Sequence, residues 1–225
     1  MAALPKSLRS RVPGRLRDDV RLRALALGLG LIPPRTMHSS EDAEVLLAAA
    51  RGAARVVEIG VYEGASALAL LEVLPAAAEL HLIDPFGRHP DALPSGWGAS
   101  ERATRRLVER RARRLGTAAP RVVWHPELSA EVARRWSGEV EVLFIDGDHS
   151  ERGCDTDWES WSPFIPVGGR VVFHDARADR PGGRGLPGPT AVLERRVRIE
   201  GAGEWEIAAE ADRTVAVRRI ATTPS

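Results

Sequence analysis

The sequence predicts an α/β fold: a Rossmann-like, seven-stranded, mostly parallel sheet with an antiparallel last strand and helices on both faces. Short apolar runs rich in valine, leucine and isoleucine alternate with helix-like segments over most of the chain. These runs are continuous rather than alternately polar, which is typical of parallel strands buried on both faces. Two further strand-like segments near the C-terminus are joined by a short turn, which is the pattern of a hairpin.

The N-terminal part differs from the rest, and we divide the chain into a lead-in over residues 1–40 and a main domain over 41–225. The lead-in is basic, with a helix expected over 16–29 that ends at Gly30 and the Pro33-Pro34 pair. Ser39 or Ser40 is then expected to cap a helix that runs to about Arg51.

The main domain is expected to alternate strands and helices before it closes with the hairpin. The expected strands cover 55–59, 79–83, 121–124, 140–145, 169–173, 204–209 and 214–220. The expected helices cover 65–74, 100–115, 130–136, 150–161 and 190–199. Two loops rich in proline and glycine, 85–99 and 178–189, are expected to shape a substrate site.

The composition excludes several classes of protein. The 225 residues have a formal net charge of +1, which gives no attraction to nucleic acid or to an anionic membrane. No apolar run reaches the roughly 20 residues of a membrane span, and Pro33-Pro34 follows the signal-like run 25–32. Cys154 is the only cysteine, so no intramolecular disulfide can form. We expect a cytoplasmic protein with no nucleic-acid or membrane partner, and a homo-oligomer is left open.

The residues after the first two strands predict a cofactor pocket. Gly60 and Gly64 allow a tight turn and a close ligand approach to a helix N-terminus, and Glu58 offers a carboxylate to an ammonium group. Asp84 follows the second strand roughly 20 residues on, where Rossmann-type folds place an acid that binds ribose hydroxyls. Alternatively, Asp84 is a turn aspartate before Pro85.

The residues after the fourth and fifth strands predict a catalytic cluster. Neighbouring parallel strands would bring Asp146, His149, His174 and Asp175 together beside the cofactor pocket. Such a cluster can hold a divalent cation, or it can orient a histidine as a base against a substrate hydroxyl. The alternative is structural: Asp148 or Ser150 caps a helix and the histidines are core residues.

Taken together, the motifs resemble a known family. They are the stretch 144–150 (Phe-Ile-Asp-Gly-Asp-His-Ser), Asp157, the stretch 161–169 (Trp-Ser-Pro-Phe-Ile-Pro-Val-Gly-Gly), His174-Asp175 and the turn with Glu58, Gly60, Gly64 and Ser66. This set resembles methyltransferase family 24, a group of class I S-adenosylmethionine (SAM)-dependent methyltransferases similar to the macrocin-type sugar O-methyltransferases of antibiotic biosynthesis. The resemblance covers about residues 36–176.

The resemblance implies a cofactor and a reaction. Glu58, Gly60, Gly64 and Ser66 are expected to bind the methionine part of SAM, and Asp84 its ribose. The reaction is expected to be O-methylation of a small-molecule acceptor, a natural product or a sugar. The alternatives are a SAM-fold enzyme with non-methylating chemistry and a non-catalytic SAM-binding protein. The catalytic cluster speaks against the second of these, because cofactor binding alone does not require it.

The resemblance also implies a base and a metal. His149 corresponds to the general base, with Asp146 and His174 as further catalytic residues. Asp146, His174 and Asp175 correspond to the ligands of a divalent metal such as Mg²⁺. His174, however, stands where metal-dependent relatives carry an acid, and Mg²⁺ prefers oxygen ligands. Either a softer ion binds, or His174 is a second base and no metal is needed.

Overall fold

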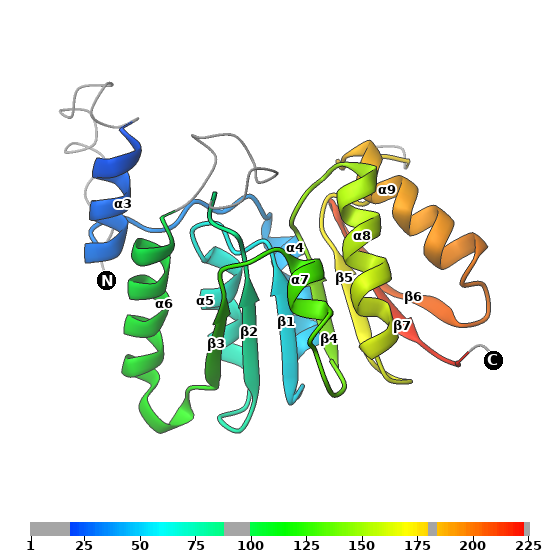
Figure 1. The fold of residues 1–225 in the computed structure, drawn as a ribbon, viewed down its shortest axis with the longest axis horizontal. Coiled ribbons are helices and arrows are strands. Elements are labelled where there is room, and N and C mark those ends of the chain that lie inside the picture. Colours follow the sequence, from blue (N-terminus) through cyan, green and yellow to red (C-terminus); the bar gives the residue numbers. More distant parts are fainter. Residues whose placement is uncertain (1–18, 88–99, 180–183, 223–225) are drawn as a thin grey trace.

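The computed structural model describes residues 19–87, 100–179 and 184–222 and confirms the predicted fold class. A seven-stranded sheet has the order β3-β2-β1-β4-β5-β7-β6 (Figure 1). The first five strands pair in parallel, and β7 is antiparallel to both β5 and β6. The strands are β1 (Arg55–Ile59), β2 (Glu79–Ile83), β3 (Arg121–His125), β4 (Val142–Ile145), β5 (Arg170–Phe173), β6 (Trp205–Ala211) and β7 (Thr214–Arg219).

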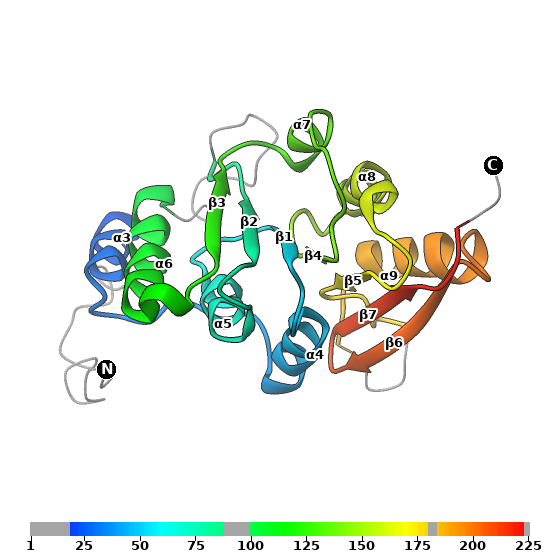
Figure 2. The ribbon, with the colours of Figure 1, turned by 90° about the horizontal axis from the view of Figure 1, so that it is seen from below.

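Helices cover both faces of the sheet, as expected (Figure 2). One face carries α4, α5 and α6, and the other carries α7, α8 and α9. The helices are α3 (Val20–Leu29), α4 (Ser40–Ala50), α5 (Ala65–Val73), α6 (Glu101–Leu115), α7 (Ser129–Ala133), α8 (Glu151–Trp161) and α9 (Pro187–Leu193). A π-helical segment, Glu194–Ile199, continues α9.

The core forms two layers because successive strand residues face opposite sides of the sheet. In β1, Val56 packs with the helices on the α5 side and Val57 packs with those on the α8 side. Both side chains are fully buried, which explains why the strands read as unbroken apolar runs. Trp158 and Trp161 of α8 lie in the second of these layers, as core residues.

Serine side chains fix the starts of several helices. Ser39 accepts a hydrogen bond from the backbone of Asp42, whose side chain accepts one in return, and this capping box starts α4. Ser100 and Ser150 cap α6 and α8 by accepting hydrogen bonds from the backbone N–H groups of Ala103 and Gly153. The capping role considered for Ser150 is therefore confirmed.

A connector, residues 30–39, joins α3 to α4 along the carboxyl edge of the sheet (Figure 1). α3 lies beside α6, and Arg23 of α3 forms a bidentate ion pair with Glu63 in the β1–α5 loop at 2.6 and 2.5 Å. The backbone N–H of Arg35 also donates to Glu63 at 2.6 Å. Residues 19–39 therefore pack onto the main domain, and the division at residue 40 stays a prediction.

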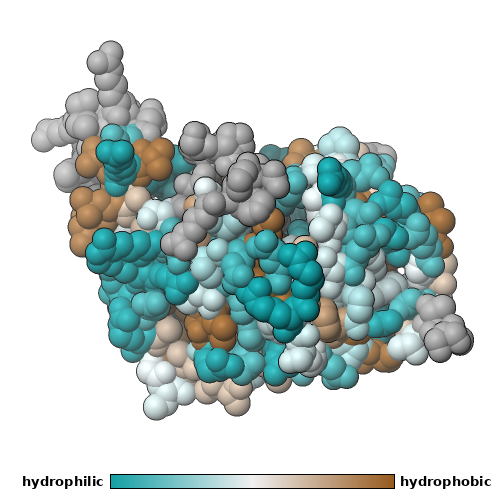
Figure 3. Space-filling view, in the orientation of Figure 1, coloured by the Kyte–Doolittle hydropathy of each residue, from teal (hydrophilic) through white to brown (hydrophobic). Residues whose placement is uncertain are grey.

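The surface over α6 is strongly hydrophilic (Figure 3). Its arginines form ion pairs with Glu72, Glu101 and Glu109. Several charges of this helix are therefore paired with neighbouring acids. Within the described ranges, no helix is long and apolar enough to cross a membrane.

Candidate active site

The β1–α5 loop forms one half of the carboxyl edge. Gly60 has φ +89°, and a Cβ atom there would lie 2.1 Å from the main-chain oxygen of Asp146. Only glycine fits this position, and the loop therefore touches the end of β4 directly. Gly64, with φ +83°, precedes α5 and provides no side-chain cap. The N-terminal N–H groups of α5 thus remain available to an anionic ligand group.

Glu58 lies beneath this loop rather than on its surface. Its side chain is fully buried, and Ser66 donates a hydrogen bond to its Oε1. Burial, helped by the nearby carboxylates of Asp146 and Asp84, raises the pKa of Glu58 to about 8, although the hydrogen bond from Ser66 opposes the shift. Its Oε2 has no hydrogen-bond partner among the described residues. A buried carboxyl with an unpaired oxygen beside two other acids would be stabilised by a cationic ligand.

Asp84 binds the same loop from the neighbouring strand. Its Oδ2 accepts hydrogen bonds from the backbone N–H groups of Val61 and Tyr62 at 2.9 and 2.8 Å. Its Oδ1 accepts from the N–H of Phe86 at 2.7 Å, so the turn role considered from the sequence is real. Burial raises the pKa of Asp84, although these three hydrogen bonds oppose the shift. Its ribose-binding role stays a prediction.

The four residues predicted after β4 and β5 do meet at the other half of the edge. His149 Nε2 lies 3.2 Å from Asp146 Oδ1 and 3.7 Å from Asp175 Oδ2. His174 Nδ1 lies 2.9 Å from the same Asp146 oxygen and 3.4 Å from Asp175 Oδ2. The predicted cluster is therefore present as a compact group of two carboxylates and two imidazoles.

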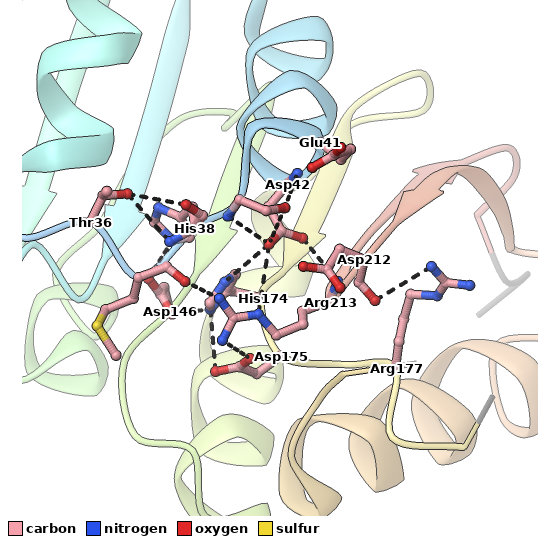
Figure 4. A network of polar contacts seen from close by, with 12 residues as sticks. Thr36, His38, Glu41, Asp42, Asp146, His174, Asp175, Arg177, Asp212 and Arg213 are labelled. Carbon is pink, nitrogen blue, oxygen red and sulfur yellow. Dashed lines mark hydrogen bonds and ion pairs between the residues drawn. The ribbon is translucent and has the colours of Figure 1, made fainter. Parts of the chain in front are cut away.

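Three further residues join the cluster that the sequence did not reveal (Figure 4). His38, from the connector, places Nε2 3.0 Å from Asp146 Oδ2. Asp42 of α4 lies 4.0 Å from His174 Nε2. Arg213, in the β6–β7 turn, lies 3.3 Å from Asp175 and donates its backbone N–H to Asp42 at 2.9 Å.

Contacts within the cluster shift the pKa values of its members. Burial alone would lower the pKa of His174, but the carboxylates of Asp146 and Asp175 outweigh it and raise the value to about 10. Burial opposes ionisation of Asp146, yet its contacts with His149, His174 and His38 hold its pKa well below the usual range. The Asp146 carboxylate raises the pKa of His149.

Asp175 also carries backbone strain. Its φ of +55° is unusual for a residue other than glycine. Such conformations cost about 1–3 kcal/mol and concentrate at functional sites, where they aim a side chain. Here the strain follows the end of β5 directly and turns the carboxylate towards His174 and Arg213.

Other residues named from the sequence lie outside the cluster. Asp157 is buried behind the turn at Gly147 and accepts a hydrogen bond from Ser129. Cys154 is buried in α8, and burial raises the pKa of its thiol to about 12, which makes it unreactive. Most of the loop 85–99 lies outside the described residues. The loop 178–189 is described in part, and its Leu186 donates to the main-chain oxygen of Asp175 at 2.7 Å.

Comparison with known families gives a match over this whole edge. A family model described as a methyltransferase domain (Methyltransf_24) matches residues 57–176, more than half of the chain. The matched range begins in β1 and ends after β5, so it contains both halves of the site.

Solved structures share the fold at low sequence identity. TomG, an O-methyltransferase of Streptomyces achromogenes involved in tomaymycin synthesis and solved with SAM, has a TM-score of 0.58 and 16% identity over 90% of each chain. The O-methyltransferase NovP has a TM-score of 0.60 and 18% identity over 89% of each chain. A methyltransferase from Geobacter sulfurreducens has a TM-score of 0.56 and 14% identity over 96% of this chain and 94% of that one.

Proposed function

The chain belongs to methyltransferase family 24, a family of class I SAM-dependent methyltransferases, and on this premise we propose that it methylates a hydroxyl group of a small molecule with His149 as the general base. The observation that carries the proposal is the contact between the two halves of the site. Gly60 touches the main chain of Asp146, whose carboxylate lies 3.2 Å from His149. A base therefore lies immediately beside the cofactor loop.

The β1–β2 half fits SAM. The proposed cofactor residues are Glu58, Gly60, Gly64, Ser66 and Asp84. Gly60 leaves no room for a side chain, α5 has no side-chain cap, and Glu58 Oε2 is buried without a partner in the described ranges. These features suit a ligand with both a carboxylate and an ammonium group. When bound, SAM supplies an electrophilic methyl group.

His149 is placed to move the acceptor's proton. Asp146 and Asp175 lie at 3.2 and 3.7 Å from Nε2, so the neutral ring carries its proton there and presents a lone pair at Nδ1. The carboxylates stabilise the imidazolium that forms when Nδ1 accepts the proton of a hydroxyl. The His149 side chain is 37% exposed, so the proton can then leave to solvent.

Asp146 and His174 hold the base in position. The same oxygen of Asp146 faces His149 and His174, and His174 is only 1% exposed. A rigid buried pair beneath the base fixes the acceptor oxygen relative to the cofactor, which is the main requirement of an in-line displacement.

The acceptor class is taken from the resemblance and from two structural relatives. TomG is an O-methyltransferase of tomaymycin synthesis and NovP is an O-methyltransferase. We propose a natural product or a sugar as acceptor. The expected metal set of Asp146, His174 and Asp175 does not suit Mg²⁺, because His174 brings a nitrogen where that ion prefers oxygen. No step of the proposed mechanism uses a metal.

The test is methyl transfer from methyl-labelled SAM to a panel of sugar and phenolic hydroxyl compounds, read as labelled product by mass spectrometry. We expect product with at least one hydroxyl class and its loss in His149→Ala. His125→Ala is the matched control, because His125 is half-buried but lies on β3, away from the cluster. Equal product formation by wild type and His149→Ala would refute the role of the base. Label found only on nitrogen or carbon acceptors would refute O-methylation.

A further inference from the structure

We propose that His38, Asp146 and His174 form a binding site for a divalent transition ion that prefers nitrogen ligands, such as Fe²⁺, Co²⁺ or Zn²⁺. The site deepens the proposed function because it lies in the acceptor half. It does not depend on methyl transfer, since it can bind its ion without turnover. Its new element is His38, which comes from the connector and not from the strand ends.

The three donors are spaced as ligands of one ion. His38 Nε2 lies 3.0 Å from Asp146 Oδ2, and His174 Nδ1 lies 2.9 Å from Asp146 Oδ1. Ligand atoms of all three residues lie within 4.8 Å of one another. Donors bound to a single ion at about 2.1 Å lie roughly 3.0 to 4.2 Å apart. An ion therefore fits with only small shifts of the side chains.

A second observation also points to a ligand. His174 is 1% exposed, yet neither of its ring nitrogens makes an aligned hydrogen bond within the described part of the chain. Buried polar atoms nearly always have a partner. The ring lies edge-on to that of His38, with 4.3 Å between the centroids, and both rings flank Asp146 (Figure 4). Nδ1 is 2.9 Å from Asp146 Oδ1 without making an aligned hydrogen bond to it, and an ion between them would give both atoms a well-directed contact.

The charges around the cluster suit a divalent ion that replaces the protons of the histidines, since a metal-bound imidazole is neutral. Asp42, Asp146 and Asp175 provide three carboxylates, and Arg213 provides one guanidinium, 3.3 Å from Asp175 and 3.7 Å from Asp42. Two negative charges remain if the histidines are neutral. One divalent ion neutralises them, which reduces the cost of burying the acids.

The donor types select the ion. Two imidazoles and one carboxylate favour first-row transition ions over Mg²⁺, which prefers an octahedron of oxygens. Asp175 also lies near His174, but its Oδ1 is 3.3 Å from the guanidinium of Arg213, which repels a cation, so we assign His38 rather than Asp175 as the third ligand. The triad leaves coordination positions open to an acceptor hydroxyl, and it leaves His149 Nδ1 free for the proton.

Cobalt is the direct probe, because Co²⁺ bound to nitrogen ligands has visible absorption bands that need no turnover. The tag-free protein is stripped with a chelator and titrated with Co²⁺, then with Zn²⁺ and Mg²⁺ as competitors. We expect one Co²⁺ per chain, displacement by Zn²⁺, and affinity for Mg²⁺ at least about 100-fold weaker. A folded protein that binds no Co²⁺, or that binds Mg²⁺ as tightly, would overturn the proposal.

Two variants locate the site. His38→Ala should weaken Co²⁺ binding about 100-fold or more. His174→Asp should raise the affinity for Mg²⁺ and lower the affinity for Co²⁺. His125→Ala should bind Co²⁺ as the wild type does. Unchanged Co²⁺ affinity in a folded His38→Ala would overturn the assignment of His38. Co²⁺ binding without methyl transfer would refute the proposed function but support the metal site. Methyl transfer without Co²⁺ binding would support the proposed function but refute the metal site.

Discussion

The two halves of the carboxyl edge are built in opposite ways. In the β1–β2 half, backbone and hydroxyl groups hydrogen-bond the acids: Asp84 accepts three backbone hydrogen bonds and Glu58 Oε1 accepts one from Ser66, although Glu58 Oε2 has no partner among the described residues. In the β4–β5 half, the charged groups face one another, and the buried imidazole of His174 contacts Asp146 and Asp175 but makes no aligned hydrogen bond within the described residues. The first half is therefore a preformed loop suited to a ligand. The second is a charged cluster whose charges a bound ligand or proton would balance.

We propose that this difference separates cofactor binding from proton transfer. A preformed loop binds its cofactor with little reorganisation, which favours affinity. In a cluster of imidazoles and carboxylates, an imidazole can accept a proton while the carboxylates stabilise its charged form, which favours turnover. Changes in the first half should therefore act on the dissociation constant of SAM, and changes in the second half on kcat.

The largest effect is expected at the point where the halves touch. Gly60→Ala places a Cβ atom 2.1 Å from the Asp146 oxygen at a φ of +89°, so the loop or β4 must move. We expect loss of detectable SAM binding and a fall of about 3 kcal/mol or more in the free energy of unfolding. Calorimetry and chemical denaturation measure the two.

Gly52→Ala is the matched control for this change. Gly52 has φ +77° but nothing within 4 Å of the added atom. It should cost only about 1–2 kcal/mol, from the left-handed backbone alone, and should leave SAM binding unchanged. Equal losses in the two variants would show that the contact between the halves is unimportant.

The next largest effect is expected at His149, the proposed general base. His149→Ala should lower kcat about 10²- to 10⁴-fold and leave the dissociation constant of SAM within about twofold of wild type. Steady-state kinetics with a responsive acceptor, together with a SAM titration, give both values. A large rise in the dissociation constant with little change in kcat would assign His149 to cofactor binding. It would contradict the proposed division of roles between the two halves.

A smaller effect is expected in the binding half. Asp84→Asn keeps the size of the side chain but retains one acceptor oxygen, so at least one of the N–H groups of Val61, Tyr62 and Phe86 loses its partner. The dissociation constant of SAM should rise about 10- to 100-fold, since each lost buried hydrogen bond costs about 1–3 kcal/mol. At saturating SAM, kcat should stay close to the wild-type value. A loss confined to kcat would contradict the division.

The smallest effect concerns pH. Burial raises the pKa of Glu58 from 4.5 to about 8, so the folded protein holds this proton more tightly than the unfolded chain. Glu58 therefore costs stability as pH rises from about 4.5 to 8, and the cost is constant above that range. The stability advantage of Glu58→Gln over wild type should grow by up to about 1.4 kcal/mol between pH 6 and pH 7. A difference independent of pH would show that Glu58 is ionised throughout.

Much of the fold could be predicted because its signals are local. The residues of β1 and β2 were predicted without error, and most other elements began or ended within three residues of their expected bounds. The helix expected from residue 190 begins three residues earlier than expected, because Pro189 and Gly188 suggested a loop. Proline is tolerated in the first turn, and the helix begins at Pro187 and continues as a π-helical segment to Ile199.

The site was predictable only where it follows strand ends. Asp146 and His174 could be paired because their strands were expected to be neighbours. His38 lies 108 residues before Asp146 and reaches the cluster because the connector packs along the sheet edge. Arg213 lies in the β6–β7 turn and reaches it through the packing of the hairpin. No local pattern encodes such contacts. The pairing of Asp84 with backbone amides was likewise hidden, because it depends on the path of a loop.

The most direct test of the account is a calorimetric titration with S-adenosylhomocysteine of the wild type, Gly60→Ala and His149→Ala. The account predicts one binding site per chain in the wild type, competition by SAM, the same affinity in His149→Ala, and no detectable binding in Gly60→Ala. A folded wild type that binds neither compound, or a loss of binding in His149→Ala as large as in Gly60→Ala, would contradict it.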